Sequence, residues 1–167
     1  MTQKIKAQKS PENTANKIPS AAKNKIITSG KRKTAVARAI LTDGSGKVSL
    51  NNQNYKNLQL FDKLKIEEPL RIAKEILGED NIKFDVVIKM RGGGEKSQVE
   101  AARLALARAI IEFSKAEAKE LSKEKYKELK EAYLRYDRNL LVADVRQKEA
   151  YKPGDSKARA KRQTSYR

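Results

Sequence analysis

With 167 residues, the chain is long enough for one compact domain with a hydrophobic core, and its length gives no reason to expect two. A formal net charge of +17 causes self-repulsion, so the composition predicts a polyanionic partner that neutralises it. Cysteine and histidine are both absent, which excludes disulfides, thiolate metal sites and imidazole general bases.

Residues 1–25 carry six lysines against one glutamate, together with two prolines and several Asn and Gln residues. Such a segment cannot bury enough apolar surface to order itself, so the sequence predicts a disordered basic arm. A transit peptide is the alternative interpretation. Transit peptides are rich in arginine, however, and this arm contains none.

A strand is predicted where the arm ends. Residues 26–28 and 34–41 have the β-branched alternation of a strand, and residues 29–33 interrupt it. We therefore expect Gly30 to mark a bulge or bend. One face of this stretch has small side chains that would let a helix pack closely: Ala35, Ala37 and Ala39.

A hairpin is predicted next. Residues 43–46 read Asp-Gly-Ser-Gly, which is a strong turn signal. Residues 47–50 are then expected to form the strand that returns along the first one. The polar residues 51–57 are predicted to be a loop.

Two carboxylates and a proline are expected to open the first helix. Glu67 and Glu68 would lie near the positive end of the helix dipole, and Pro69 suits the first turn. An apolar stripe continues from there to Leu77, and Gly78 is expected to end the helix.

The clearest strand covers residues 82–90, where apolar and charged side chains alternate. After a triple glycine, a long helix is predicted, with inward residues at helical spacings: Val99, Leu106, Ile110 and Phe113. Residues 115–136 continue helically, with three inward side chains: Leu121, Leu129 and Tyr133. Residues 136–142 are predicted to be the last segment packed on the domain.

The triple glycine before the long helix invites a phosphate-loop interpretation. A Walker motif requires glycine directly before Lys-Ser, and Glu95 stands there instead, so the spacing argues against a nucleotide-hydrolysing enzyme. Two interpretations remain open for Gly92, Gly93 and Gly94: close approach to a nucleic-acid phosphate, or a tight strand-to-helix turn. We find no catalytic constellation, and we expect no cofactor and no metal.

The last sixteen residues, 152–167, carry six cations against the single carboxylate Asp155, and Tyr166 is their only large apolar side chain. Such a segment is predicted to be disordered in isolation. Stretched to about 3.3 Å per residue, its cations could track a phosphate backbone. A solubilising basic tail is the alternative.

Nucleic acid is favoured over an anionic membrane as the partner. No apolar run approaches the roughly 18 residues of a spanning helix, and the basic segments lack interleaved Trp, Phe or Leu. The N-terminus has no apolar segment typical of a signal peptide, so we expect none. The composition permits a cytoplasmic location.

Stretches from about residue 26 to the end carry a family resemblance. They are residues 28–38 (TSGKRKTAVAR), 68–70 (EPL), 84–88 (FDVVI), 91–94 (RGGG), Gln98 with 101–103 (AAR) and 107–108 (AR), 136–142 (YDRNLLV) and 157–167 (KARAKRQTSYR). In this order they resemble the small-subunit ribosomal protein nine family, in the form found in archaea and the eukaryotic cytosol. Residues 1–25 lie outside the shared pattern.

The resemblance implies an α+β fold. We expect a small mixed four-stranded sheet with helices packed mainly on one face, similar to the second domain of small-subunit ribosomal protein five, with long basic N- and C-terminal extensions. The predicted parts are the arm at 1–25, the core domain at 26–144 and an extended tail at 145–167.

The resemblance also implies a structural, non-enzymatic constituent of cytoplasmic small ribosomal subunits. Its partners would be the rRNA of the subunit head, neighbouring head proteins and the anticodon stem-loop of the peptidyl-site tRNA. Residues implied to bind rRNA are Lys31, Arg32, Lys33, Arg38, Arg91, Gly92, Gly93, Gly94, Arg103, Arg146, Lys152, Lys157, Arg159, Lys161 and Arg162. Residues implied to contact tRNA are Gln163, Ser165, Tyr166 and Arg167. A free protein that packages DNA or RNA is the alternative.

Overall fold

The computed structural model describes residues 25–78, 83–117, 123–151 and 158–159. Within them the strands are β1 (Ile26–Arg32), β2 (Ala35–Asp43), β3 (Val48–Leu50), β4 (Gln53–Asn54) and β5 (Phe84–Arg91). The helices are α1 (Leu60–Leu77), α2 (Glu95–Glu117) and α3 (Lys123–Tyr136), with short 3₁₀ helices at Tyr55–Asn57 and Arg138–Leu140. The predicted arm, apart from Lys25, and most of the predicted tail lie outside the described residues.

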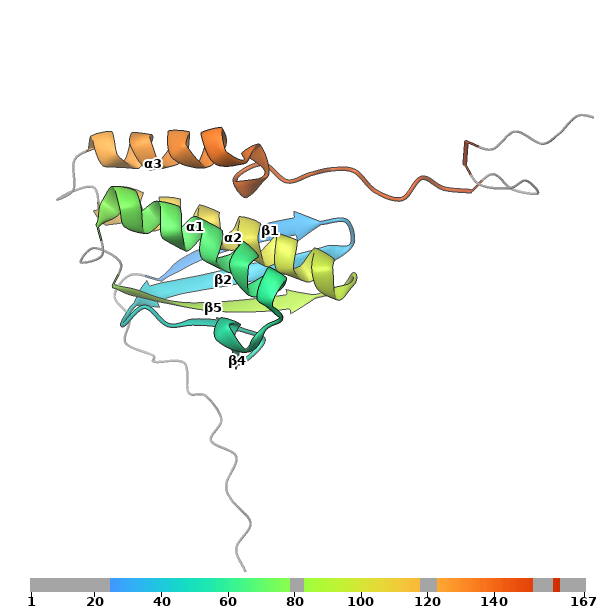
Figure 1. The fold of residues 1–167 in the computed structure, drawn as a ribbon, viewed down its shortest axis with the longest axis horizontal. Coiled ribbons are helices and arrows are strands. Elements are labelled where there is room, and N and C mark those ends of the chain that lie inside the picture. The colour runs from blue at the N-terminus through green and yellow to red at the C-terminus, as the bar shows by residue number, and fades with distance from the viewer. Residues whose placement is uncertain (1–24, 79–82, 118–122, 152–157, 160–167) are drawn as a thin grey trace, which may run out of the picture.

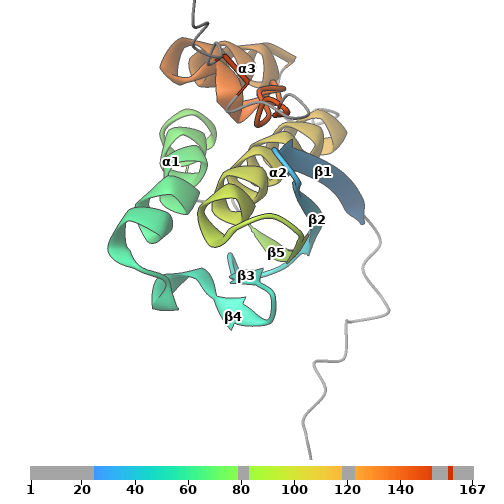
Figure 2. The ribbon, with the colours of Figure 1, turned by 90° about the vertical axis from the view of Figure 1, so that its right-hand side faces the viewer.

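The strands form one mixed sheet in the order β1-β2-β5-β3-β4. Only the β3–β5 pair is parallel among these pairings. Helices α1 and α2 lie on one face of the sheet, as Figures 1 and 2 show, and α3 packs on these two helices. The α+β class and the helices on one face agree with the sequence-based prediction.

Alternation along the central strands decides which face the helices cover. Every second residue of β2 is fully buried, namely Ala35, Ala37, Ala39 and Leu41. The corresponding residues of β5 are Phe84, Val86 and Ile88. From α2, the predicted inward residues Val99, Leu106, Ile110 and Phe113 join the same core, which confirms that helix face. The residues between them along β2 and β5 form the open face of the sheet.

Helix α2 approaches β1 closely at Gly30. A Cβ built on Gly30 would lie 2.1 Å from the Ala101 carbonyl oxygen of α2. Next to it, the Thr28 hydroxyl donates a hydrogen bond to the Ala105 carbonyl oxygen at 2.8 Å. The expected bulge is wrong, because Gly30 pairs with Ala37 in an unbroken register along β1. The predicted strand is instead two strands, because the chain turns at Lys33 and Thr34 and β2 then pairs antiparallel with β1. Gly30 lies within β1 and marks the helix contact.

The predicted four-stranded sheet has five strands, and the predicted hairpin partner is wrong. Strand β3 pairs with β5 instead of β2, because the loop between β2 and β3 crosses the start of β5. The Asp85 carboxylate holds this loop by accepting hydrogen bonds from the Ser45 and Lys47 N–H groups at 2.8 and 2.9 Å. Strand β4 has only two residues, both polar and exposed, so it carries no alternation that a sequence pattern could detect.

Helix α1 begins at Leu60, earlier than predicted, and Pro69 lies in its interior. Its first turns hide the expected pattern, because Leu60 and Phe61 are exposed while Asp62 is buried. The Lys96 ammonium of α2 contacts the Asp62 carboxylate at 2.7 Å, which explains how this charge is tolerated inside. The predicted end of the helix at Gly78 is confirmed.

The C-terminal part of the domain is held by Tyr133 and Leu140, which are fully buried. The Tyr133 hydroxyl donates to the Pro69 carbonyl oxygen at 2.7 Å, and burial raises the pKa of this phenol. The predicted inward positions Leu129 and Tyr133 are confirmed, whereas Leu121 lies outside the described residues.

The contact at Gly30 gives a testable prediction. Replacing Gly30 by alanine should lower the free energy of unfolding by about 1–3 kcal/mol, because the added methyl meets helix backbone that cannot rotate away. Gly94→Ala is the matched control, since a Cβ there has no atom within 4 Å. Urea denaturation of both variants measures the difference, and equal stabilities would contradict the close approach.

Candidate nucleic-acid interface

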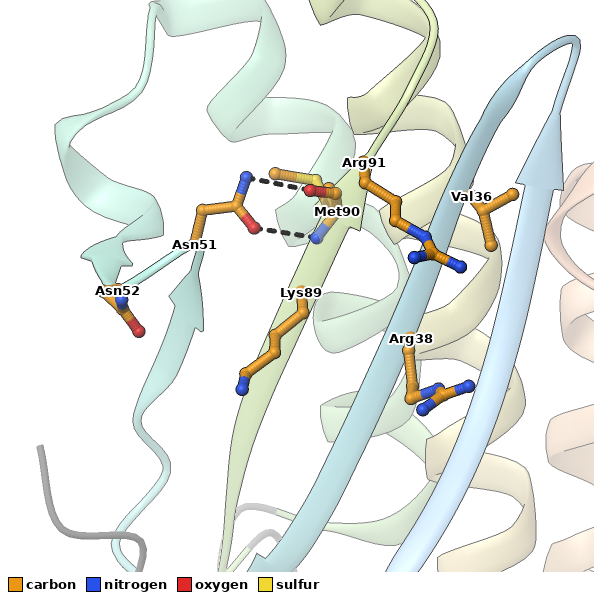
Figure 3. Close-up of a pocket in the computed structure, with 7 residues that line it drawn as sticks. All are labelled: Val36, Arg38, Asn51, Asn52, Lys89, Met90 and Arg91. Atoms are coloured by element: carbon orange, nitrogen blue, oxygen red, sulfur yellow. Dashed lines mark hydrogen bonds between the residues drawn. The ribbon is translucent and has the colours of Figure 1, made fainter.

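The open face of the sheet carries unpaired cations. Arg38 of β2 and Lys89 and Arg91 of β5 are exposed, and no ion pair joins them to any part of the chain that the structure describes. They line a groove of about 560 Å³, shown in Figure 3, together with Val36, Asn51, Asn52 and Met90. Arg38 and Arg91 were predicted from the sequence, and Lys89 was not. The two-residue period that places Lys89 beside Arg91 on one face was the signal that could have found it.

Asn51 closes the side of this groove. It adopts a left-handed backbone, with φ of 45°, at the end of β3. Its side-chain amide donates to the Met90 carbonyl oxygen at 3.3 Å and accepts from the Met90 N–H at 2.7 Å. The nitrogen and the oxygen of the Asn51 side-chain amide therefore both face the backbone of β5 at Met90, as the dashed lines of Figure 3 show. The groove is thus held in shape by the backbone of β5.

Several predicted residues meet where β1 turns into β2. Lys31 and Lys33 are exposed there, and β5 ends beside them, because Arg91 pairs with Val36. Gly92 and Gly93 follow with φ of 72° and 65°. A Cβ on Gly92 would lie 2.8 Å from the Thr34 carbonyl oxygen, so this residue serves a tight turn against the β1–β2 connection. The phosphate interpretation of the glycines stays a prediction.

Two of the predicted rRNA-binding arginines use their charge inside the domain. Arg32 forms ion pairs with Glu100 at 2.8 Å and with Asp144 at 3.1 Å. Arg103 pairs with Asp137 at 2.8 Å and with Glu68 at 2.5 Å, and only 15% of its side chain is exposed. Their contact with rRNA stays a prediction. Both guanidinium groups are largely occupied by carboxylates of the domain, and little of either side chain is exposed.

The role predicted for Glu67 and Glu68 is wrong. Because α1 begins at Leu60, neither carboxylate lies at the positive end of the helix. Glu67 pairs with Lys63 and Arg71 along the helix surface. Glu68 points at Arg103 of α2 and so joins the two helices.

A third arginine, Arg108 of α2, fixes the chain beyond α3. Its guanidinium donates two hydrogen bonds to the Leu141 carbonyl oxygen, at 3.0 and 2.8 Å, and one to the Ser29 carbonyl oxygen at 2.8 Å. With Arg32 and Arg103 it ties residues 137–146 to β1 and α2. We call residues 137–146 the tail root. Sequence reasoning did not assign this role to Arg108.

The Asp144 and Glu100 carboxylates, which both pair with Arg32, have lowered pKa values. The Arg146 backbone N–H donates to Asp144, and with the nearby charges of Arg32, Arg146 and Lys33 it lowers the pKa of this carboxyl below its ordinary value. Partial burial of Glu100 works against ionisation. The hydrogen bonds from Arg32 and Lys65 outweigh that effect, so the pKa of Glu100 is also lowered.

Residues 145–151, which begin with the last two residues of the tail root, are all exposed and run away from the domain, past the β1–β2 turn in Figure 1. Arg146 is exposed at the start of this segment. Arg159 is 89% exposed and pairs with Glu149 at 3.0 Å. Eight predicted site residues lie outside the described residues: Lys152, Lys157, Lys161, Arg162, Gln163, Ser165, Tyr166 and Arg167.

None of the helices in the described part of the chain has the length and apolar character needed to cross a membrane. The same residues contain no group of three or more carboxylate side chains arranged to hold a metal ion.

Comparison with known proteins defines the class. Residues 30–167 match the family model described as Ribosomal protein S9/S16. The small ribosomal subunit protein uS9 of Methanococcus vannielii is 47% identical over 148 residues, and that of Methanococcus maripaludis strain C5 is 44% identical over 148 residues. The uS9 protein of Methanothrix thermoacetophila is 43% identical over 143 residues. Each match covers 85% of this chain and 98% of the relative.

These relatives are structural proteins of the small ribosomal subunit, a non-enzymatic class that acts in translation. The chain belongs to the ribosomal protein S9/S16 family. The resemblance to this family and the absence of enzymatic function that it implies are confirmed. Membership places the chain on the ribosome together with rRNA and is consistent with cytoplasmic ribosomes.

The contacts of Arg108 predict how the tail root responds to substitution. Arg108→Lys keeps the charge but lacks the planar fork that reaches Leu141 and Ser29 together, so the root should lose its fixed direction. The chain has no cysteine, so spin labels at Gln147→Cys and Glu112→Cys report one distance. We expect that distance distribution to broaden.

The control for this measurement is Arg71→Lys, because Arg71 pairs only with Glu67 on the surface of α1 among the contacts that the structure shows. It should leave the label distances unchanged. An equally narrow distribution in Arg108→Lys, with the domain folded, would mean that the arginine does not position the root.

Proposed function

We propose that the chain binds the small-subunit rRNA in the head and directs its C-terminal tail toward the anticodon stem-loop of the peptidyl-site tRNA. The charge of residues 152–167, six cations against one carboxylate, is the observation that carries this proposal. Such a segment gains most by replacing the condensed counterions of a phosphate backbone. Membership of a small-subunit ribosomal family supports rRNA as that polyanion.

Exposed cations at one end of the domain extend this charge. Lys31 and Arg91 both pair with Val36, Lys33 lies in the adjoining turn beside Gly92, and Arg146 is exposed where the tail leaves. We assign rRNA contacts to these four, to Arg38 and the glycines at 92–94, and to the tail cations Lys152, Lys157, Arg159, Lys161 and Arg162. Arg32 and Arg103 form ion pairs within the domain, so we propose that they position the tail and do not contact rRNA.

The tip of the tail is assigned to tRNA, through Gln163, Ser165, Tyr166 and Arg167. The Arg167 guanidinium can offer a forked pair of donors to a phosphate, and the terminal carboxylate must then be held away from that anion. The direction of the exposed segment 145–151, past the β1–β2 turn, supports a tail that works at a distance from the core.

Neighbouring proteins of the head are further proposed partners. The beginning of α1 exposes apolar side chains that suit such contacts, since Leu60 is 66% exposed and Phe61 is 77% exposed. Single exposed apolar residues are ordinary, but two adjacent ones in a helix form a patch that a neighbouring protein can cover.

Co-sedimentation tests the assignment to the subunit. The purified chain, added to small subunits that lack it, should sediment with them in a one-to-one ratio at ordinary salt. Random duplex DNA as competitor should not remove it, because a folded subunit offers contacts beyond charge. Loss of the chain at ordinary salt, or equal binding to duplex DNA, would favour the packaging alternative.

Removal of residues 164–167 tests the tail. Subunits carrying the shortened chain should assemble normally but bind peptidyl-site tRNA about tenfold or more weakly, because a charge-assisted contact of Arg167 is lost. A chain that lacks residues 2–5, also four residues with one cation, is the control. Unchanged tRNA affinity in filter binding of the tail variant would refute the assignment.

A further inference from the structure

The open face of the sheet holds like charges directly opposite each other. Arg38 of β2 pairs across the ladder with Lys89 of β5, and Arg91 lies two residues further along β5. Side chains directly opposite in an antiparallel pair have Cβ atoms about 5 Å apart, and diagonal neighbours lie within reach of long side chains. Like charges in this arrangement destabilise a sheet. We call Arg38, Lys89 and Arg91 the open-face triad.

No carboxylate within the described residues relieves this repulsion. The one acidic residue of β5, Asp85, is also on the open face, but its carboxylate accepts hydrogen bonds from Ser45 and Lys47. It precedes Lys89 by four residues, or about 13 Å along the strand, which exceeds the screening length of physiological salt. The open-face triad is therefore a cationic site whose charge no nearby carboxylate of the described residues neutralises.

The other side chains of this face decide what kind of anion fits. The neighbours of the triad on β1, β2 and β5 are Ile27, Ser29, Lys31, Val36, Ile40 and Val87, none of them aromatic. Sheets that bind unpaired bases do so by stacking them on aromatic side chains, which these strands do not offer. Asn52 lines the same groove, and its amide makes no hydrogen bond to the described part of the chain, so it can bond to a phosphate or a 2′-hydroxyl.

We propose that the open-face triad is a binding site for the sugar-phosphate backbone of double-helical RNA, and that the bound phosphates relieve the repulsion between Arg38 and Lys89. The proposal deepens the proposed rRNA binding and rests on it. It adds Lys89 to the interface and names the bound form as a duplex recognised by shape and charge. Binding should be tolerant of sequence, because no contact to base edges is involved.

The first test measures stability without RNA. In the full-length chain at low salt, Lys89→Gln and Arg38→Gln should each raise Tm by roughly 1–3 °C, because each removes a repulsive pair. The double variant should gain less than the sum of the two, since one substitution already removes the repulsion. Lys130→Gln is the charge-matched control: Lys130 is exposed on α3 and has no ion pair among the described residues.

The second test measures binding to a random-sequence RNA duplex of about 16 base pairs, to oligouridine of the same length and to inorganic phosphate. Each triad variant, Arg91→Gln included, should bind the duplex more weakly and lower the slope of log K against log salt by about one. Lys130→Gln should retain the wild-type duplex affinity and slope. Inorganic phosphate should raise Tm of the wild-type chain more than that of the triad variants.

The outcomes separate this proposal from the one on which it rests. Triad variants that bind the duplex like Lys130→Gln overturn the triad site, even when the chain sediments with small subunits. A greater loss for oligouridine than for the duplex overturns the duplex assignment. Additive stability changes in the double variant overturn the repulsion argument. Failure of the wild-type chain to bind either RNA or subunits overturns the proposed function itself.

Discussion

The close packing of α2 against β1 and β2 is the contact on which the remaining structure depends. Gly30 has no side chain at the point of closest approach, and the alanines at 35, 37 and 39 present a low surface beside it. The helix backbone therefore lies against the strand. This depth brings Arg103 and Arg108 of α2 within hydrogen-bonding distance of the chain beyond α3. Larger side chains on β1 would displace α2 and with it every contact that fixes the tail root.

The cations of the domain divide into two groups by physical role. Arg32, Arg103 and Arg108 lie between elements, where a partly buried charge is stable only with partners, and each has them. Arg38 and Lys89 are exposed on the open face and have no such partners among the described residues. The first group sets the shape of the molecule. The second leaves the net positive charge available to an anion outside it.

The tail root links these two roles. Backbone carbonyls accept from the arginines there, and Asp137 and Asp144 supply the charge that holds them. Beyond Arg146, whose carbonyl oxygen accepts from Arg32 at 3.5 Å, the exposed residues 147–151 form no hydrogen bond or ion pair with the described part of the domain. A basic segment of this kind orders when it binds, so the direction in which it leaves the domain limits what it can reach. Fixing that direction reduces the entropy lost on binding.

The sequence by itself determined the features that are local. Alternation identified β5 and the small-residue face of β2, helical spacing identified the inward face of α2, Gly78 marked the end of α1, and family motifs identified the class of protein. Local patterns do not specify a partner across the chain. Only the tertiary structure placed β3 beside β5, where the Asp85 carboxylate accepts hydrogen bonds from the loop before β3. Only the tertiary structure could also bury the Asp62 carboxylate at the beginning of α1, because the Lys96 ammonium that neutralises it is 34 residues away in the sequence. It also decided which arginines are free, since an arginine has the same charge in the sequence whether or not a distant carboxylate faces it.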